Sequence, residues 1–198
     1  MFAIENINFK CERCGKCCKH RGDLGLTPMD VFQISKYLNI SCEEMVRRYT
    51  RLSHRHGNFP QLVIQGVGKQ STCIFYDRRS GCKIYPARPA QCYLFPLEPL
   101  TPSTSPNPKF GIRECYSNAK TDDKMPVQEW IRRSSDRYEA EKDIFHWYME
   151  TLPGLERFCE DNSYSKDQIK HLIYCEYDLT KDMDEQIKYN LSNKIFYV

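Results

Sequence analysis

Four of the eleven cysteines in this 198-residue chain are gathered in one short stretch, CERCGKCC. Cys11, Cys14 and Cys17 follow one another at intervals of three residues, and Cys18 comes directly after them. An irregular loop can turn thiols at this interval toward one centre, and Gly15 permits the tight turn that such a loop needs. Thiols at this spacing have little use in a hydrophobic core, so the stretch predicts a metal-binding loop.

Two kinds of metal centre use this spacing. A tetrahedral zinc ion takes four thiolates, often from two CxxC pairs. A [4Fe–4S] cluster takes three cysteines from a CxxCxxC loop and a fourth from elsewhere in the chain. Three evenly spaced thiols favour the iron–sulfur cluster, and zinc is the alternative. We expect Cys17 and Cys18 to point in different directions along an extended backbone, so that Cys18 reaches a second metal ion, bridges two metal ions, or packs.

Further candidate ligands come later in the chain, at Cys73, Cys82, Cys92 and Cys115. The Gly81-Cys82 turn resembles a metal knuckle. Eight candidate thiols would satisfy two tetrahedral sites or two clusters, whereas a single cluster would use four. The other cysteines fall on predicted helices and are expected to be small buried hydrophobic residues: Cys42, Cys159 and Cys175.

The rest of the composition limits the class of protein. No apolar run reaches the length of a membrane span, and the first ten residues lack the basic and apolar regions of a secretory signal. We therefore expect a cytoplasmic protein with reduced thiols, in which clustered cysteines are metal ligands more often than disulfides.

Charge is distributed unevenly along the chain. Residues 1–120 carry 18 Lys and Arg against 9 Asp and Glu, a net +9, and residues 121–198 carry a net −6. A basic surround suits an anionic thiolate cluster. Because the basic residues are scattered and no nucleic-acid-binding motif accompanies them, we expect no nucleic-acid partner. Because no apolar run is long enough, we also expect no membrane partner. A protein partner or substrate is left open.

The residue patterns around the cysteines predict an α+β fold that is mainly helical. In this fold, bound metal holds an irregular cysteine-rich lobe together and helices pack around the lobe. We expect a cysteine-cluster domain over 1–120 and a helical C-terminal extension packed on it over 121–198. Residues 1–24 are predicted to be irregular. Thr27, Pro28 and Asp30 predict the start of a helix, and Ser41 with Glu44 predicts a second helix that runs to about residue 50.

The remaining segments follow from turn residues and periodicity. Residues 59–68 and 71–77 read as short strands, 78–82 as a turn, and the proline-rich stretch 96–111 as a loop. From Pro126, apolar residues recur at helical spacing and predict one long helix that ends near Pro153. Two more helices are expected near 165–175 and 181–194, with Ser165 and Thr180 as their N-caps.

The cysteine pattern resembles the CxxCxxCC cysteine-cluster family of the YkgJ type, a zinc- or iron-chelating domain. The resemblance spans roughly residues 8–117 and rests on three motifs in order: Cys11-x-x-Cys14-Gly15-x-Cys17-Cys18, Leu26-Thr27-x-x-Asp30, and Gly81-Cys82-x-Ile84-Tyr85-x-x-Arg88-Pro89-x-x-Cys92-x-x-Phe95-Pro96. The same cysteine pattern occurs in flagellin lysine N-methylases, where it resembles an iron–sulfur site that works with S-adenosylmethionine (SAM). This chain departs from the family by having Tyr93 where Arg usually follows the cysteine.

The resemblance implies a metal-binding protein whose candidate ligands are Cys11, Cys14, Cys17, Cys18, Cys73, Cys82, Cys92 and Cys115. An iron–sulfur centre would serve electron transfer or SAM-dependent protein lysine N-methylation, although no SAM-binding motif is present. A zinc-binding structural module and a metal-handling protein without catalysis are the alternatives. Arg88 and Tyr85 are the candidate cofactor contacts. Arg88 would donate to a thiolate or an anionic substrate, or else to a backbone carbonyl; Tyr85 would cover the cluster, or else pack in the core.

Overall fold

The computed structural model describes residues 3–9, 14–19, 24–53, 60–100, 109–112, 120–134, 154, 157, 161 and 164–193. Within these residues the chain forms six α-helices and five antiparallel pairs of short strands, so the fold is α+β. In the same part of the chain, no helix is both long and apolar enough to cross a membrane.

The first two helices begin where their capping residues predict. Helix α1 (Pro28–Leu38) follows Thr27, whose hydroxyl accepts a hydrogen bond from the Asp30 N–H while the Asp30 carboxylate accepts one from the Thr27 N–H. Helix α2 (Cys42–Tyr49) follows Ser41, whose hydroxyl accepts from the Glu44 N–H at 3.1 Å. Each bond satisfies a backbone donor that the first helical turn leaves without a partner.

Two helices near the C-terminus overlap the ranges predicted for them. Helix α6 (Lys166–Tyr174) begins after Ser165, which forms a reciprocal capping box with Gln168. Helix α7 (Met183–Asn193) starts later than predicted. Thr180 is not its cap, because the carboxylate of Asp182 accepts the N–H groups of Asp184 and Glu185 at 2.9 and 3.1 Å.

The strands are only two to seven residues long. They pair as β1 (Asn6–Phe9) with β10 (Lys120–Pro126), β2 (Thr50–Leu52) with β3 (Leu62–Ile64), β4 (Gly66–Val67) with β5 (Thr72–Cys73), β6 (Tyr76–Asp77) with β7 (Gly81–Cys82), and β8 (Leu97–Pro99) with β9 (Phe110–Ile112). The strands predicted within 59–68 and 71–77 are therefore present, each broken into two short pieces.

Three predictions about local structure need correction. Residues 1–24 are not wholly irregular, because β1 pairs with β10. The stretch 96–111 is not wholly a loop, because its two ends form β8 and β9, which bury Leu97 and Phe110. The long helix predicted from Pro126 begins as α4 (Val127–Ser134), and the rest of that prediction lies outside the described residues.

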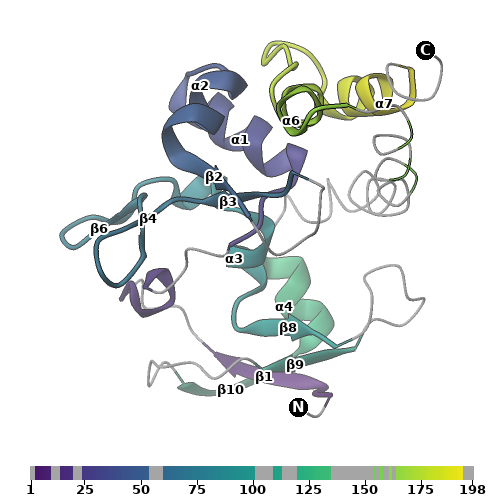
Figure 1. Ribbon diagram of the computed structural model, residues 1–198. Helices are drawn as coiled ribbons and strands as arrows, with labels where there is room; N and C mark the ends of the chain where they lie inside the picture. The colour runs from purple at the N-terminus through teal and green to yellow at the C-terminus, as the bar shows by residue number, and fades with distance from the viewer. Residues whose placement is uncertain are drawn as a thin grey trace.

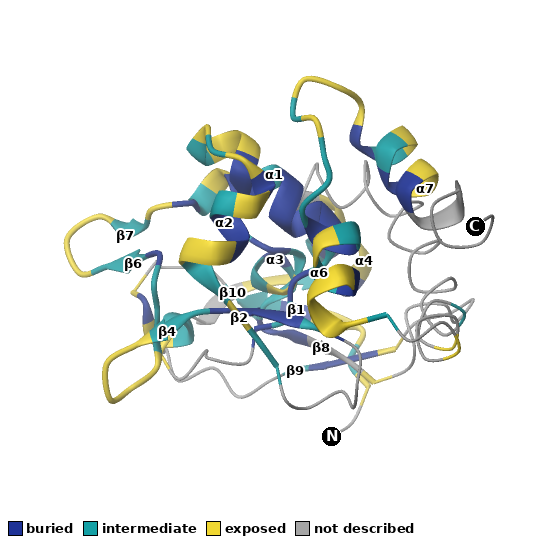
Figure 2. Cartoon of the chain, turned by 45° about the horizontal axis from the view of Figure 1, so that its top comes forward, coloured by how far each residue is buried: buried dark blue, intermediate teal, exposed yellow. Residues whose placement is uncertain are grey.

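The described residues bury two hydrophobic cores. Helices α1, α2, α6 and α7 and strand β3 enclose the larger core at one end of the molecule (Figure 1), where α1 is mostly buried and α6 is buried along one side (Figure 2). Strands β1, β8, β9 and β10 and helix α4 form the other end. The smaller core there contains Ile7, Leu97, Phe110, Val127 and Ile131. The short helix α3 (Ala90–Leu94) lies between the two ends (Figure 1).

The C-terminal helices share the larger core with the N-terminal ones. Ile173 and Tyr174 of α6 are 0% and 1% exposed, and both α6 and α7 contact α1. The Tyr174 hydroxyl donates to the carbonyl oxygen of Leu26 at 3.4 Å, next to the start of α1. Helix α6 therefore supports the segment that leads out of the cysteine loop.

Candidate metal centre

Five of the predicted ligands line a single cavity of about 340 Å³. They are Cys17, Cys18, Cys73, Cys82 and Cys92, all partly buried. Residues of both cores complete the wall, so the cavity lies between the two ends of the molecule. Cys14 is exposed, and Cys11 and Cys115 lie outside the described residues.

The cysteine loop is fixed by a close contact with strand β6. Gly15 has a left-handed φ of 72°, and a side chain at this position would overlap the ring of Tyr76. The Tyr76 hydroxyl donates to the carbonyl oxygen of Cys14 at 3.3 Å. Only glycine combines this backbone conformation with so close an approach.

Cys17 and Cys18 lie in a single turn of 3₁₀ helix, η1 (Lys16–Cys18), which the Cys18 N–H closes onto the Gly15 carbonyl at 3.0 Å. The expectation that an extended backbone points these two thiols apart is therefore wrong. The tight turn brings both side chains to the same cavity.

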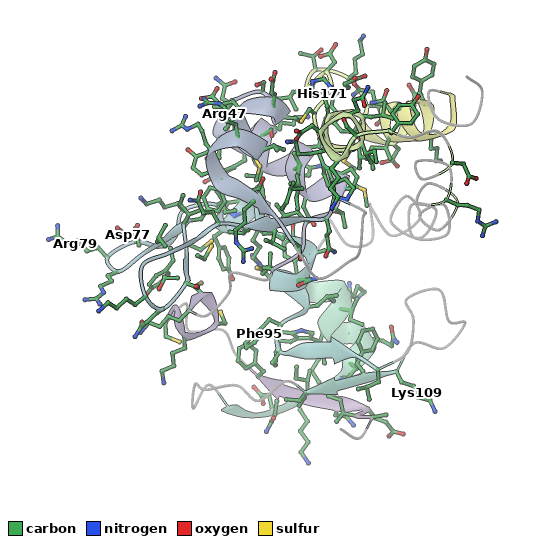
Figure 3. All side chains as sticks on the ribbon, in the orientation of Figure 1. Arg47, Asp77, Arg79, Phe95, Lys109 and His171 are labelled. Atoms are coloured by element: carbon green, nitrogen blue, oxygen red, sulfur yellow. The ribbon has the colours of Figure 1, made fainter. Side chains whose placement is uncertain are left out.

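Two hairpins present Cys73 and Cys82 to this cavity. Cys73 ends the hairpin β4–β5, and Cys82 lies opposite Tyr76 in the hairpin β6–β7. The predicted turn at 78–82 is present, and the Asp77 carboxylate closes it by accepting the N–H groups of Arg79 and Ser80. Asp77 and Arg79 lie at the outer end of this hairpin, so its tip points away from the body of the molecule (Figure 3).

The thiols disfavour one another's ionisation. Burial raises the pKa of Cys73 to about 11, with smaller contributions from Cys82 and Cys17, although the N–H groups of Phe75 and Tyr76 bond to its sulfur and oppose the rise. A hydrogen bond with Cys17, burial, and the nearby Cys17, Cys73 and Cys92 raise the pKa of Cys18 far above its usual range. A bound cation would offset this mutual repulsion and stabilise the thiolates.

The segment between Ile84 and Phe95 supplies the fifth thiol and the one charged side chain among the described lining residues. The 3₁₀ turn η2 (Tyr85–Ala87) leads into α3, which carries Cys92. The guanidinium of Arg88 lies between the rings of Tyr85 and Tyr93, at 4.1 and 4.6 Å from their centroids, and donates to the Tyr85 carbonyl at 3.0 Å. Arg88 therefore makes the bond to a backbone carbonyl that one prediction requires. It also lines the cavity, where the other prediction places it beside a thiolate or an anionic substrate.

Sequence reasoning missed an aromatic wall on the side of the smaller core. The ring of Phe9 packs edge-to-face against Phe95 at 5.8 Å and against Trp130 at 5.6 Å, and all three line the cavity. Figure 3 shows Phe95 in the space between α3 and β1. Phe95 belongs to the Cys92-x-x-Phe95-Pro96 motif, but no local signal marks Phe9, and the periodicity around Trp130 predicts an ordinary core residue.

The cysteines that are not predicted ligands belong to the larger core where the structure describes them. Cys42, the first residue of α2, is buried, and Cys175 follows the end of α6 and packs against the same core. Burial raises the pKa of Cys175 to about 12. Cys159 lies outside the described residues.

The chemistry of the wall fits a thiophilic metal. Within the described residues, the cavity wall has no His, Asp or Glu side chain and has five cysteines, and thiolates select zinc and iron–sulfur clusters over hard cations. In the same part of the chain, no three His, Cys, Asp or Glu side chains meet closely enough to hold one metal ion. The five thiols thus share a cavity wall without converging on a single point.

Comparison with known proteins places this chemistry in a family. A stretch of 94 residues is 36% identical to an uncharacterized protein of Methanocaldococcus jannaschii, and it covers 47% of each chain, so this chain matches about half the length of that relative. No solved structure matches the chain. The model of the CxxCxxCC family, described as "Putative zinc- or iron-chelating domain", matches residues 10–127. The chain therefore belongs to the CxxCxxCC family.

Proposed function

We propose that this protein holds an iron–sulfur centre of the [4Fe–4S] type. The observation that carries the proposal is the gathering of five thiols, from η1, two hairpins and α3, around one cavity. A zinc ion and a [4Fe–4S] cluster each take four thiolates, so the number of thiols does not separate them; a cluster, however, spreads its ligands over a wider space than a single ion, which agrees with described thiols that share a cavity wall without meeting at one point. Cys11, Cys14 and Cys115 are proposed as further ligands on sequence grounds alone.

The cavity has the volume of the smaller cavities that hold organic ligands. Cavities that hold small organic ligands measure roughly 300 Å³ and more, and this one has about 340 Å³. Arg88 and Tyr85 are the proposed contacts of a cofactor or substrate in that space, because Arg88 brings positive charge to an otherwise apolar and thiol-lined wall. SAM, which carries a carboxylate and a flat base, is one cofactor of suitable chemistry.

In this proposal, the side chains around the thiols control the access of water and the charge at the centre. A cysteine-ligated iron–sulfur centre supplies one-electron transfer, at a potential that the surrounding protein tunes. Phe9, Phe95 and Trp130 would exclude water from the side that faces the smaller core. Arg88 would balance the negative charge of the thiolates. The activity would be electron transfer or the SAM-dependent methylation of a protein lysine, in the cytoplasm.

Zinc remains a second candidate because of one local feature. Cys73 accepts backbone N–H groups from Phe75 and Tyr76, the arrangement that stabilises a thiolate in a metal knuckle, and Cys82 lies in the adjacent hairpin. A zinc site whose positions were all filled would make the lobe a structural or interaction module. A metal-handling protein would instead exchange its metal readily, for which the exposed Cys14 would offer access.

A pair of serine variants tests whether the cavity thiols hold metal. Cys73 and Cys175 are both partly buried thiols whose pKa is raised mainly by burial, but only Cys73 lines the cavity. We expect Cys73→Ser, purified without oxygen, to lose most of its bound metal because a ligand is gone, and Cys175→Ser to retain it. Iron, zinc and acid-labile sulfide per chain are the measured quantities. Equal metal content in the Cys73→Ser variant and the parent would refute the proposed site.

A further inference from the structure

A carboxylate outside the cysteine motifs joins the first helix to the segment that carries Cys92. Asp30 is 2% exposed. Its Oδ2 atom accepts hydrogen bonds from the N–H and the hydroxyl of Thr27, both at 2.9 Å, which close the N-terminus of α1. Its Oδ1 atom accepts the N–H of Ala90 at 3.0 Å, 60 residues farther along the chain.

The bond to Ala90 falls at a position that has no cap of its own. Ala90 is the first residue of α3, and the residue before it, Pro89, offers no side-chain hydrogen bond to the helix. The first N–H groups of a helix need an outside acceptor, and Asp30 provides one from another element. One buried carboxylate therefore caps two helices, and it fixes the start of α3 against the start of α1.

Helix α3 is short and would be a poor support for a ligand without such an anchor. It has five residues, Ala90–Leu94, and Cys92 lies two residues after the anchored N–H. Arg88 lies two residues before it, and both Arg88 and Cys92 line the cavity. Isolated helices of this length do not hold together in water, so the position of Cys92 depends on contacts from outside the helix.

We infer that Asp30 is a positioning residue of the metal centre, which acts by fixing the helix that carries Cys92. This inference rests on the proposed function, because it needs metal in the cavity, but it holds for iron and for zinc alike. Asp30 does not touch the metal in this account. It restricts where the Cys92 sulfur can lie, as hydrogen bonds behind a ligand do in other metal sites.

The first test compares four variants of the full chain, purified without oxygen. Asp30→Asn removes acceptor capacity from the junction. Ala90→Pro removes the N–H that Asp30 accepts, and it does so at the first position of a helix, where proline is well tolerated. Thr27→Val removes the hydroxyl that caps α1 and donates to Asp30 Oδ2, but it leaves the bond between Asp30 and Ala90 in place. Ser165→Ala removes the matched capping box of α6, which lies outside the cavity wall. The rate at which each protein releases its metal to EDTA is measured by metal analysis.

We expect Asp30→Asn and Ala90→Pro to release metal about tenfold faster than the parent, the effect typical of lost support behind a ligand. Thr27→Val and Ser165→Ala should stay within about twofold, because capping alone costs helix stability without moving Cys92. Amide hydrogen exchange of residues 88–94 should rise in the first two variants only. Release by Asp30→Asn and Ala90→Pro at the parent's rate would overturn the inference, as would equally fast release by Thr27→Val and Ser165→Ala.

A second test asks whether Asp30 acts through Cys92. If it does, adding Asp30→Asn to a Cys92→Ser chain should change neither its metal content nor its release rate, since the ligand being positioned is already absent. A further loss on adding Asp30→Asn would contradict this route. A parent chain that contains no stoichiometric metal would refute the proposed function itself, which is a different result from a metal-loaded parent in which Asp30 has no effect.

Discussion

Gly15 shows how one residue type sets the geometry of the cysteine loop. The sequence predicts a tight turn there, and the structure adds the reason that no other residue fits: the ring of Tyr76 occupies the space that a side chain would need. Tyr76 also bonds to the carbonyl of Cys14. The contact therefore holds the loop with Cys17 and Cys18 against the hairpin with Cys82.

Two glycine variants separate backbone strain from this contact. Gly15 and Gly68 have nearly equal left-handed φ angles, 72° and 69°, but a side chain at Gly68 meets nothing within 4 Å in the described structure. Replacement by alanine should cost both proteins about 1–2 kcal/mol of unfolding free energy from strain. Gly15→Ala should lose more because of the overlap with Tyr76, and it should also bind metal more weakly.

Denaturant unfolding and metal content measure the two effects. The account expects Gly68→Ala to keep the parent's metal content. If the two variants were equally destabilised and both retained metal, the contact between Gly15 and Tyr76 would have no part in the site.

At the level of single residues, the sequence predicts the candidate ligands better than the residues that support them. The spacing in the first loop singles out Cys17 and Cys18, and the family resemblance with the Gly81-Cys82 turn singles out Cys73, Cys82 and Cys92, and all five line the cavity. The capping role of Asp30 is also predictable from the local sequence. Its bond to Ala90 is not, since nothing in the sequence relates positions 60 residues apart, and the same is true of the ring contacts that Phe9 makes.

Among the elements, those defined by local rules were predicted well. Helices α1, α2 and α6 start at Thr27, Ser41 and Ser165 because a capping side chain bonds to its own helix. Strands β1 and β10 were not predicted because each depends on a partner more than a hundred residues away, as in the pairing of Ile7 with Met125. Helix α7 was misplaced because Thr180 and Asp182 are both good capping residues, and only the structure shows that Asp182 is used.

Removal of the metal should affect the elements unequally. Strands β4, β5, β6 and β7 have two residues each, so few backbone hydrogen bonds hold these hairpins. Helices α1, α2 and α6 pack against one another in the larger core, and none of their residues lines the cavity. We expect anaerobic treatment with a chelator to raise amide hydrogen exchange in residues 66–82 and to leave these three helices protected.

Hydrogen exchange with and without metal is compared against an internal reference, which the three helices provide within each sample. Unchanged exchange in both hairpins after complete metal removal would show that the lobe folds without metal. Exchange that rose equally in the hairpins and the three helices would show instead that metal supports the whole domain and not the lobe alone.

In the molecule as a whole, the candidate centre lies where two hydrophobic cores meet. The larger core supplies Leu24, Ile64 and Ile84 to the cavity wall, and the smaller core supplies Phe9 and Trp130. A cavity between two packed units is a common place for a ligand or cofactor. The net charge of +9 over residues 1–120 would favour an anionic thiolate centre.

The most direct test of the central claim is the analysis of protein purified without oxygen. Visible absorption, iron, zinc and acid-labile sulfide would be measured on one sample. The account predicts a brown protein in which iron and sulfide are present in equal amounts. A colourless protein with stoichiometric zinc and no sulfide would contradict the iron–sulfur proposal and establish the cysteine cavity as a zinc site.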